Sequence, residues 1–192
     1  SRCGNGLAPV AGSVLQLGPS LDPSRSTPLE NFATKSDRYV SIARRLESLL
    51  EGERDFLANT ANMAALVFEL VGDLNWAGFY FRQGEELVLG PFQGRVACVR
   101  IEIGRGVCGT AASRGESIVV ENVHQFDGHI ACDAASNAEL VVPLVEDGRV
   151  LGVFDLDSPT VARFDDEDRR GVEELVRVYQ RCTDLAPLKA MA

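Results

Sequence analysis

The sequence has few basic residues for its size and lacks any long apolar run. Its 192 residues include 19 Lys and Arg against 28 Asp and Glu, which gives a formal net charge of −9. A surface this acidic argues against binding to the phosphate backbone of nucleic acids and to anionic lipid. No window approaches the roughly 18 consecutive apolar residues that a membrane-spanning helix requires. We therefore expect no nucleic-acid partner and no membrane partner.

Cysteine is also sparse, and the five thiols are dispersed along the chain: Cys3, Cys98, Cys108, Cys132 and Cys182. They are too few for a small domain held together by disulfides, and their odd number leaves one unpaired if all the others were bridged. No basic stretch followed by an apolar segment and a small-residue cleavage site indicates secretion. We therefore expect a cytoplasmic protein, in a reducing compartment where cysteine is more often catalytic, metal-binding or buried than cross-linked.

The apolar fraction of 45% is that of an ordinary folded domain. Residues 1–34 differ from the rest, because they are rich in Gly and Pro and show no sustained periodicity. We expect them to form a flexible N-terminal extension, and the sequence leaves its role open, organelle targeting included. We place a single folded domain over residues 35–185 and a C-terminal tail over 186–192.

The hydrophobic periodicity changes along the domain from helical to strand-like and back. Apolar residues recur every three or four positions over 36–50, where Ser36 can cap the helix, and over 55–70. Alternating patterns and a last helical segment follow: strands 75–81, 87–89, 98–103, 118–121, 139–145 and 149–157, and helix 165–182. Short turns, including Asp147-Gly148, favour antiparallel pairing. We therefore predict an α+β domain with a central antiparallel sheet of five to six strands and helices packed mainly on one face.

The segment 104–109 (GRGVCG) fits the GxGxxG pattern of dinucleotide-binding loops. The strand before it alternates, with Arg100 and Glu102 facing water, whereas the corresponding strand of a dinucleotide-binding fold is buried on both faces. The helical segment that follows, 108–113, is too short to cross over a parallel sheet. The interpretation we favour is a glycine-rich turn.

Side chains that can bind metals gather in the long connection 122–138. They are His124, His129, Cys132 and Asp133, and Cys98 or Cys108 could join them. Zinc sites commonly contain closely spaced pairs such as CxxC or HxxxH, and neither occurs here. We therefore expect no metal site.

The cysteines differ in the chemistry that their positions favour. Cys182 ends a helix and fits a small packed hydrophobe. Cys108 begins a short helix, where the helix dipole lowers a thiol pKa, and burial there is an equally good interpretation. Cys132 lies outside any apolar periodicity, in the middle of a loop where a thiol is accessible. A reactive thiol is therefore most expected at Cys132.

Two pairs of side chains share faces of predicted strands. Asp155 and Asp157 lie two apart in an otherwise apolar strand, so that their like charges raise at least one pKa. Such a pair suits proton donation or cation binding, and a solvent-exposed strand end explains it equally well. Trp76 and Tyr80 lie together on one face of strand 75–81.

Taken together, these segments resemble the free methionine-(R)-sulfoxide reductases over about residues 36 to 182. The resemblance lies in 75–80 (NWAGFY), 90–94 (GPFQG), 97–101 (ACVRI), 104–112 (GRGVCGTAA), 129–137 (HIACDAASN), 142–144 (VPL) and 157–159 (DSP). Cys98, Cys108 and Cys132 follow the family's spacing. The family has the GAF fold, which agrees with the predicted α+β class and places the glycine-rich turn in the loop that carries Cys108.

The resemblance implies thiol chemistry with no metal and no bound cofactor. Cys132 would attack the sulfoxide sulfur, giving a sulfenic acid and free methionine, and Cys98 would then form a disulfide with it. Thioredoxin would reduce this disulfide with electrons that come ultimately from NADPH. Cys108 is an alternative resolving thiol.

The resemblance also implies the substrate contacts. Three acids match residues that hold the substrate and help to protonate its oxygen: Glu139, Asp155 and Asp157. Trp76 and Tyr80 match an aromatic wall around the methyl group. Because a free amino acid is a zwitterion, its carboxylate also needs a partner, and we expect backbone amides near Ile130 and Ala131 to provide it. The family suggests a homodimer. The alternative function is a GAF module that senses a small ligand without turnover.

Overall fold

Two helices precede the sheet in the computed structural model, which describes residues 32–126 and 135–192. Helix α1 (Lys35–Leu50) buries four apolar side chains at three- and four-residue spacing, and helix α2 (Phe56–Val71) begins after Asp55, whose side chain accepts a hydrogen bond from the Ala58 amide. The cap predicted at Ser36 is wrong. Thr34 caps α1 by accepting from the Asp37 amide, so that the helix begins before Ser36.

Six strands form one sheet, and every pairing among the described residues is antiparallel. The strand order is β3-β2-β1-β6-β5-β4. The strands are β1 (Trp76–Gln83), β2 (Glu86–Gly94), β3 (Arg100–Glu102), β4 (Ile118–Val120), β5 (Ala138–Glu146) and β6 (Arg149–Ser158). The predicted α+β class with an antiparallel sheet is confirmed, and β1 and β6 lie at its centre.

The hairpin between β5 and β6 follows directly from its turn residues. Asp147 and Gly148 both have positive φ, 51° and 75°, as a two-residue turn that matches the twist of the strands requires. The strand predicted over 98–103 is shorter in the structure. Ile101 is the one residue of β3 that is buried in a core, while Val99 is exposed.

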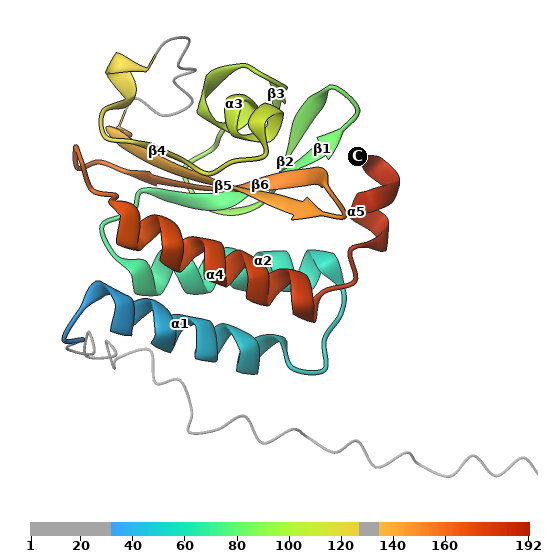
Figure 1. The fold of residues 1–192 in the computed structure, drawn as a ribbon, viewed down its shortest axis with the longest axis horizontal. Coiled ribbons are helices and arrows are strands. Elements are labelled where there is room, and N and C mark those ends of the chain that lie inside the picture. The colour runs from blue at the N-terminus through green and yellow to red at the C-terminus, as the bar shows by residue number, and fades with distance from the viewer. Residues whose placement is uncertain (1–31, 127–134) are drawn as a thin grey trace, which may run out of the picture. The chain divides into compact units, whose positions relative to one another are not determined.

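The sheet separates two cores of different size (Figure 1). On one face α2 and α4 (Asp166–Cys182) cover the sheet, and α1 packs on them as an outer layer. On the other face lies the short helix α3 (Gly106–Arg114), whose Val107 belongs to the smaller core. Phe79 of β1 belongs to the larger core and Tyr80 to the smaller one, so the predicted alternation along β1 is confirmed.

The C-terminal residues fold onto the domain instead of forming the expected tail. Residues 186–192 contain helix α5 (Ala186–Met191), which lies against β1 and β6 and buries Leu188. The segment is too short to show a helical period, and it is held by the buried Leu188 together with ion pairs from Lys189 to Glu146 and Asp147. None of the helices in the described part of the chain is long and apolar enough to cross a membrane.

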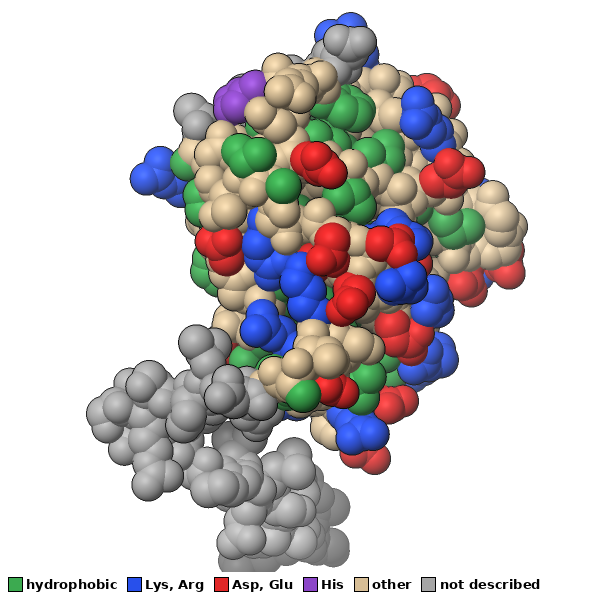
Figure 2. Space-filling model, turned by 60° about the vertical axis from the view of Figure 1, so that its left-hand side comes forward, with side chains coloured by type: hydrophobic (Ala, Val, Ile, Leu, Met, Phe, Trp, Pro, Cys, Tyr) green, Lys and Arg blue, Asp and Glu red, His purple; other side chains and the backbone are tan. Residues whose placement is uncertain are grey.

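The outer face of α4 is dominated by ion pairs between neighbouring turns. Asp166 pairs with Arg169 and Arg170, and Glu173 pairs with Arg169 and Arg177. Acidic and basic side chains are interspersed over the face drawn in Figure 2, where they surround small apolar patches. Each exposed pair contributes little to stability, so the buried cores account for most of the stability of the fold.

Candidate functional site

A cavity opens on the face of the sheet that carries α3, and residues distant in sequence line it. They are Trp76 and Tyr80 from β1, Cys108 from α3, Glu139 from β5, and Asp155 and Asp157 from β6, with Arg105, Val107 and Ser136 beside them. Strand register explains the gathering. Asp157 lies opposite Trp76 on β1 and opposite Glu139 on β5, because β6 pairs with both strands. The structure thus brings together six of the predicted site residues.

An aromatic stack forms one wall of this cavity. The Trp76 ring lies between Tyr80, at a centroid distance of 5.8 Å, and Phe92, at 5.3 Å with an interplanar angle of 16°. Gly78 allows this arrangement, since a Cβ there would lie 2.3 Å from the Phe92 Cβ and 2.6 Å from the Trp76 ring. Phe92 supports the wall through its contact with Trp76, and this contact was not predicted, because the strand of Phe92 was expected to end at Leu89.

The aromatic wall also holds the backbone that carries Cys98. The Trp76 indole Nε1–H donates to the Arg95 carbonyl oxygen at 3.1 Å, and the Tyr80 hydroxyl donates to the Cys98 carbonyl oxygen at 3.0 Å. Residues 95–99 lie outside the sheet, so these two side-chain hydrogen bonds connect them to β1. Sequence periodicity gave no indication of this link.

Two of the three acids are buried in the cavity wall. Glu139 and Asp155 are each 6% exposed, while Asp157 is half-buried. Burial raises the pKa of Asp155 to about 7. Burial, and then the nearby Asp155 and Asp157 charges, raises the pKa of Glu139 well above its ordinary range. The pair at 155 and 157 is therefore no simple solvent-exposed strand end.

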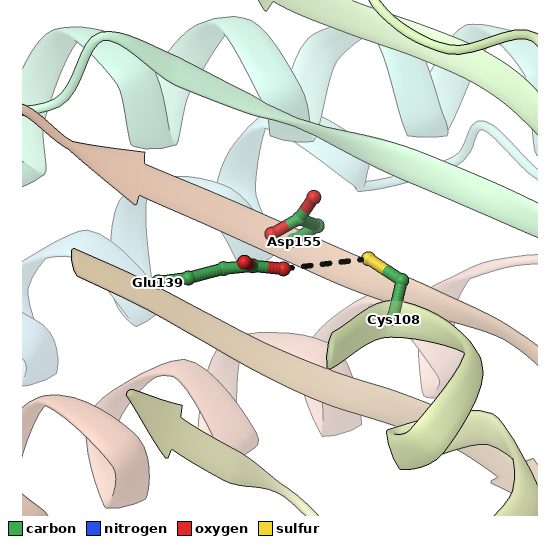
Figure 3. A group of neighbouring side chains, drawn as sticks. All are labelled: Cys108, Glu139 and Asp155. Atoms are coloured by element: carbon green, nitrogen blue, oxygen red, sulfur yellow. Dashed lines mark hydrogen bonds between the residues drawn. The ribbon is translucent and has the colours of Figure 1, made fainter. Parts of the chain in front are cut away.

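The Cys108 thiol lies beside these carboxyl groups, with its Sγ 3.8 Å from Glu139 Oε1 (Figure 3). Burial raises the Cys108 pKa well above its usual value, and the charges of Asp155 and Glu139 raise it further. Of the two interpretations that the sequence left open for Cys108, burial is therefore the one that the structure supports, and the lowered pKa is not found. The helix dipole acts on a thiol that is removed from water and faces two acids, and those two effects dominate.

The cysteines are found in two states. Cys98 is disulfide-bonded, while Cys108 and Cys182 are free thiols, so the partner of Cys98 is not among the described residues. Cys182 packs, half-buried, against the larger core as predicted. The predicted residues Cys132, Ile130 and Ala131 lie outside the described residues.

The glycine-rich segment 104–109 forms the turn into α3. Gly104 and Gly106 have positive φ of 87° and 61°, and a Cβ on Gly109 would lie 2.3 Å from the Glu102 carbonyl oxygen. Since the described strands pair only antiparallel, a dinucleotide-binding crossover is excluded there. The segment serves to place Cys108 against the sheet.

Of the four loop residues considered as metal ligands, the structure describes only His124. It is exposed, and its Nε2 lies 3.0 Å from Asn137 Oδ1. A different group meets the geometric requirement: single ligand atoms of Cys108, Glu139 and Asp155 all lie within 4.8 Å of one another. They come from three elements, so no sequence spacing could have revealed them.

Comparison with known proteins agrees with the fold and the site. A family model described as GAF domain matches residues 57–180. The chain is 54% identical to the free methionine-R-sulfoxide reductase of Escherichia coli (strain K12), over 77% of this chain and 89% of that protein.

Two solved structures are similar along most of their length. The free methionine-R-sulfoxide reductase from Neisseria meningitidis, in complex with its substrate, is 42% identical with a TM-score of 0.76, over 79% of this chain and 91% of that chain. A candidate GAF sensor protein from Burkholderia vietnamiensis is 59% identical with a TM-score of 0.74, over 77% of this chain and 94% of that chain. The expected GAF fold is confirmed.

Proposed function

The chain belongs to the GAF-domain family and, within it, to the free methionine-(R)-sulfoxide reductases, and we propose that it reduces free L-methionine-(R)-sulfoxide to L-methionine. One observation carries this proposal. A single cavity combines an aromatic wall and buried carboxyl groups with raised pKa, and its Tyr80 hydroxyl donates to the backbone carbonyl of the disulfide-bonded Cys98. Each of these parts answers a requirement of sulfoxide reduction.

The acids meet the first requirement, which is protonation of the departing oxygen. Expelling oxygen from sulfur requires a proton donor near the reacting atoms. Asp155, with a pKa of about 7, holds a proton for part of the time at neutral pH and can donate it. The neighbouring carboxyl groups of Glu139 and Asp157 can accept hydrogen bonds from the substrate ammonium group, whose positive charge favours the ionised form of a carboxyl group, and the rings of Trp76 and Tyr80 suit its S-methyl group.

The thiols meet the second requirement, which is a supply of two electrons. In the proposed cycle the Cys132 thiolate attacks the sulfoxide sulfur, and the oxygen leaves with Cys132 as a sulfenic acid while methionine departs. The Cys98 thiol then displaces water from the sulfenic acid and forms a disulfide. Thioredoxin reduces this disulfide by exchange and is itself re-reduced with electrons from NADPH.

The state of the described cysteines supports Cys98 as the resolving thiol. It already takes part in a disulfide, whereas Cys108 is a free thiol, 4% exposed, with a raised pKa. A buried thiol of high pKa attacks a sulfenic acid poorly. We therefore assign Cys98, with Cys132 as its partner, to the disulfide, and Cys108 to the acid cluster in the cavity wall.

A coupled assay tests the proposal. The protein is supplied with thioredoxin, thioredoxin reductase and NADPH, and NADPH oxidation is followed with free (R)-sulfoxide, free (S)-sulfoxide and peptide-bound sulfoxide. We expect turnover with the free R form alone. Turnover of the S epimer or of the peptide, without the free R form, would refute the proposal. The expected homodimer is tested in the same preparation by sedimentation.

A second function is favoured by one similarity, that to the candidate sensor from Burkholderia vietnamiensis. A sensor would bind its ligand in the same cavity without consuming electrons. Counting thiols before and after addition of substrate, with no reductant present, separates the two functions. A reductase loses two thiols per chain and releases methionine, whereas a sensor loses none.

A further inference from the structure

The acids and the thiol of the cavity form a compact group whose chemistry goes beyond the reduction of sulfoxides. Cys108 projects from α3, Glu139 from β5 and Asp155 from β6, and their side chains converge on one point (Figure 3). One ligand atom from each lies within 4.8 Å of the other two. We call these three residues the buried trio.

The trio is deeply buried, and one of its carboxylate oxygens has no hydrogen-bond partner in the described part of the chain. The three residues are 4%, 6% and 6% exposed, respectively. Asp155 Oδ1 is buried and has no hydrogen-bond partner among the described residues. A buried carboxylate oxygen with no donor is costly, so the group favours a bound cation or a proton.

The spacing of the donor atoms fits a tetrahedral metal site. Bonds of about 2.0–2.3 Å to a tetrahedral zinc ion place neighbouring donor atoms roughly 3.3–3.8 Å apart. The Sγ of Cys108 and Oε1 of Glu139 are 3.8 Å apart, and the most distant donor pair needs to close by only about 1 Å. The cavity, about 40 Å³ in volume, has room for an ion and a water as fourth ligand.

We propose that the buried trio binds a thiophilic divalent cation such as Zn²⁺ through Cys108 Sγ and one oxygen each of Glu139 and Asp155. Binding displaces the thiol proton to solvent, and a thiolate ligand selects zinc-like ions over Mg²⁺ and Ca²⁺, which prefer oxygen. The ion occupies the cavity that the substrate also needs, so it acts as a reversible inhibitor.

Cobalt(II) absorbance tests this site directly, because a thiolate bound to Co²⁺ gives a charge-transfer band in the near ultraviolet. The full chain is used in the state in which Cys98 is disulfide-bonded, which removes that sulfur as a ligand. We expect one Co²⁺ per chain, displaced by Zn²⁺, and no comparable binding of Mg²⁺. Free L-methionine, which consumes no electrons, should weaken the binding.

Matched variants identify the ligands. Cys108→Ser should abolish the charge-transfer band, while Cys182→Ser, which removes the other free thiol among the described residues, should leave it unchanged. Glu139→Gln and Asp155→Asn should each weaken Co²⁺ binding by more than about 10-fold, since loss of even an outer-shell partner costs roughly 10- to 100-fold. These two variants keep the side-chain size, so they test the site even where Cys108→Ser folds poorly.

A band that persists in Cys108→Ser, or disappears in Cys182→Ser, overturns the assignment, and so does binding that the Glu139 and Asp155 variants leave unchanged. Binding that methionine fails to weaken refutes the overlap with the substrate. None of these measurements requires turnover, so failure of the metal site is distinct from failure of the proposed reductase activity.

Discussion

Replacement of Asp155 by asparagine should stabilise the protein at alkaline pH while removing its proposed activity. Asp155 has a pKa of about 7 in the folded chain against 3.8 as reference. The folded state therefore keeps the proton between about pH 4 and pH 7, where the unfolded chain has lost it. The free energy of unfolding consequently falls as the pH rises through this window and stays low above it.

The magnitude follows from the size of the shift. A pKa difference of about three units between the folded and unfolded chain lowers the free energy of unfolding by about 4 kcal/mol at most. We expect about 2 kcal/mol, because Glu139 also has a raised pKa and the two buried acids titrate together. Asparagine is neutral at every pH and nearly the same shape, so Asp155→Asn avoids this cost. At pH 8 the variant should melt roughly 4–8 °C above the parent protein, and near pH 5 the two should be closer.

Urea unfolding at pH 5 and pH 8 measures the effect, with both proteins in the same disulfide state. Glu102→Gln, which neutralises an exposed acid of β3, is the matched control and should show no pH-dependent gain. The reasoning is wrong if Asp155→Asn is less stable than the parent at pH 8, or if its gain is equal at both pH values. Reductase turnover of the variant should be lost at both.

Three further sets of substitutions test the cysteines, the Tyr80 hydrogen bond and the helical layers separately. Cys132→Ser should release no methionine even in a single turnover, whereas Cys98→Ser should release one equivalent and then stall; equal single-turnover yields would contradict the assignment. Tyr80→Phe keeps the stacked ring but loses the hydrogen bond to the Cys98 carbonyl, so stopped-flow thiol titration should show disulfide closure about fivefold slower, with methionine release unchanged. Gly171→Ala would place a Cβ 2.2–2.5 Å from the Tyr39 ring, and calorimetry should show a loss of about 1–3 kcal/mol with KM unchanged, because this contact lies in the helical layers.

Local signals predicted the sheet and most of its helices. Period-two alternation placed Phe79 and Tyr80 on opposite faces of β1, and Asp-Gly predicted the turn between β5 and β6, because both features depend on backbone geometry alone. The first helix cap was misplaced since Thr34 and Ser36 are equally able to cap, and tertiary packing decides between them. The helix at 186–191 is held by the burial of Leu188 and by the ion pairs of Lys189, tertiary contacts that no periodicity can reveal.

The electrostatics of the candidate site were predictable only in part: the raised pKa predicted for the pair at 155 and 157 is found at Asp155, where burial causes it. The resemblance identified Cys108 and the acids, yet a thiol at a helix N-terminus has a lowered pKa only where water or a cation reaches it. Here strand register sets Glu139 opposite Asp157, and Asp155 lies two residues before Asp157 on the same face of β6. Helix α3 therefore covers the carboxyl groups of Glu139 and Asp155. That closure reverses the direction of the Cys108 pKa shift, and it depends on contacts between elements distant in sequence.

The residues assigned to the two steps of the proposed cycle lie on backbone that is constrained to different degrees. Asp155 lies on a central strand, with Phe154 and Leu156 packed in the larger core on the opposite face, so its position is tightly defined. Cys98 lies outside the sheet and is connected to β1 through the Tyr80 hydroxyl. Protonation of a sulfoxide needs a fixed donor, whereas thiol exchange needs a cysteine that both a second thiol and a reductant can reach. Because Tyr80 also lines the cavity, one side chain connects the cavity with the backbone of the proposed resolving thiol, Cys98.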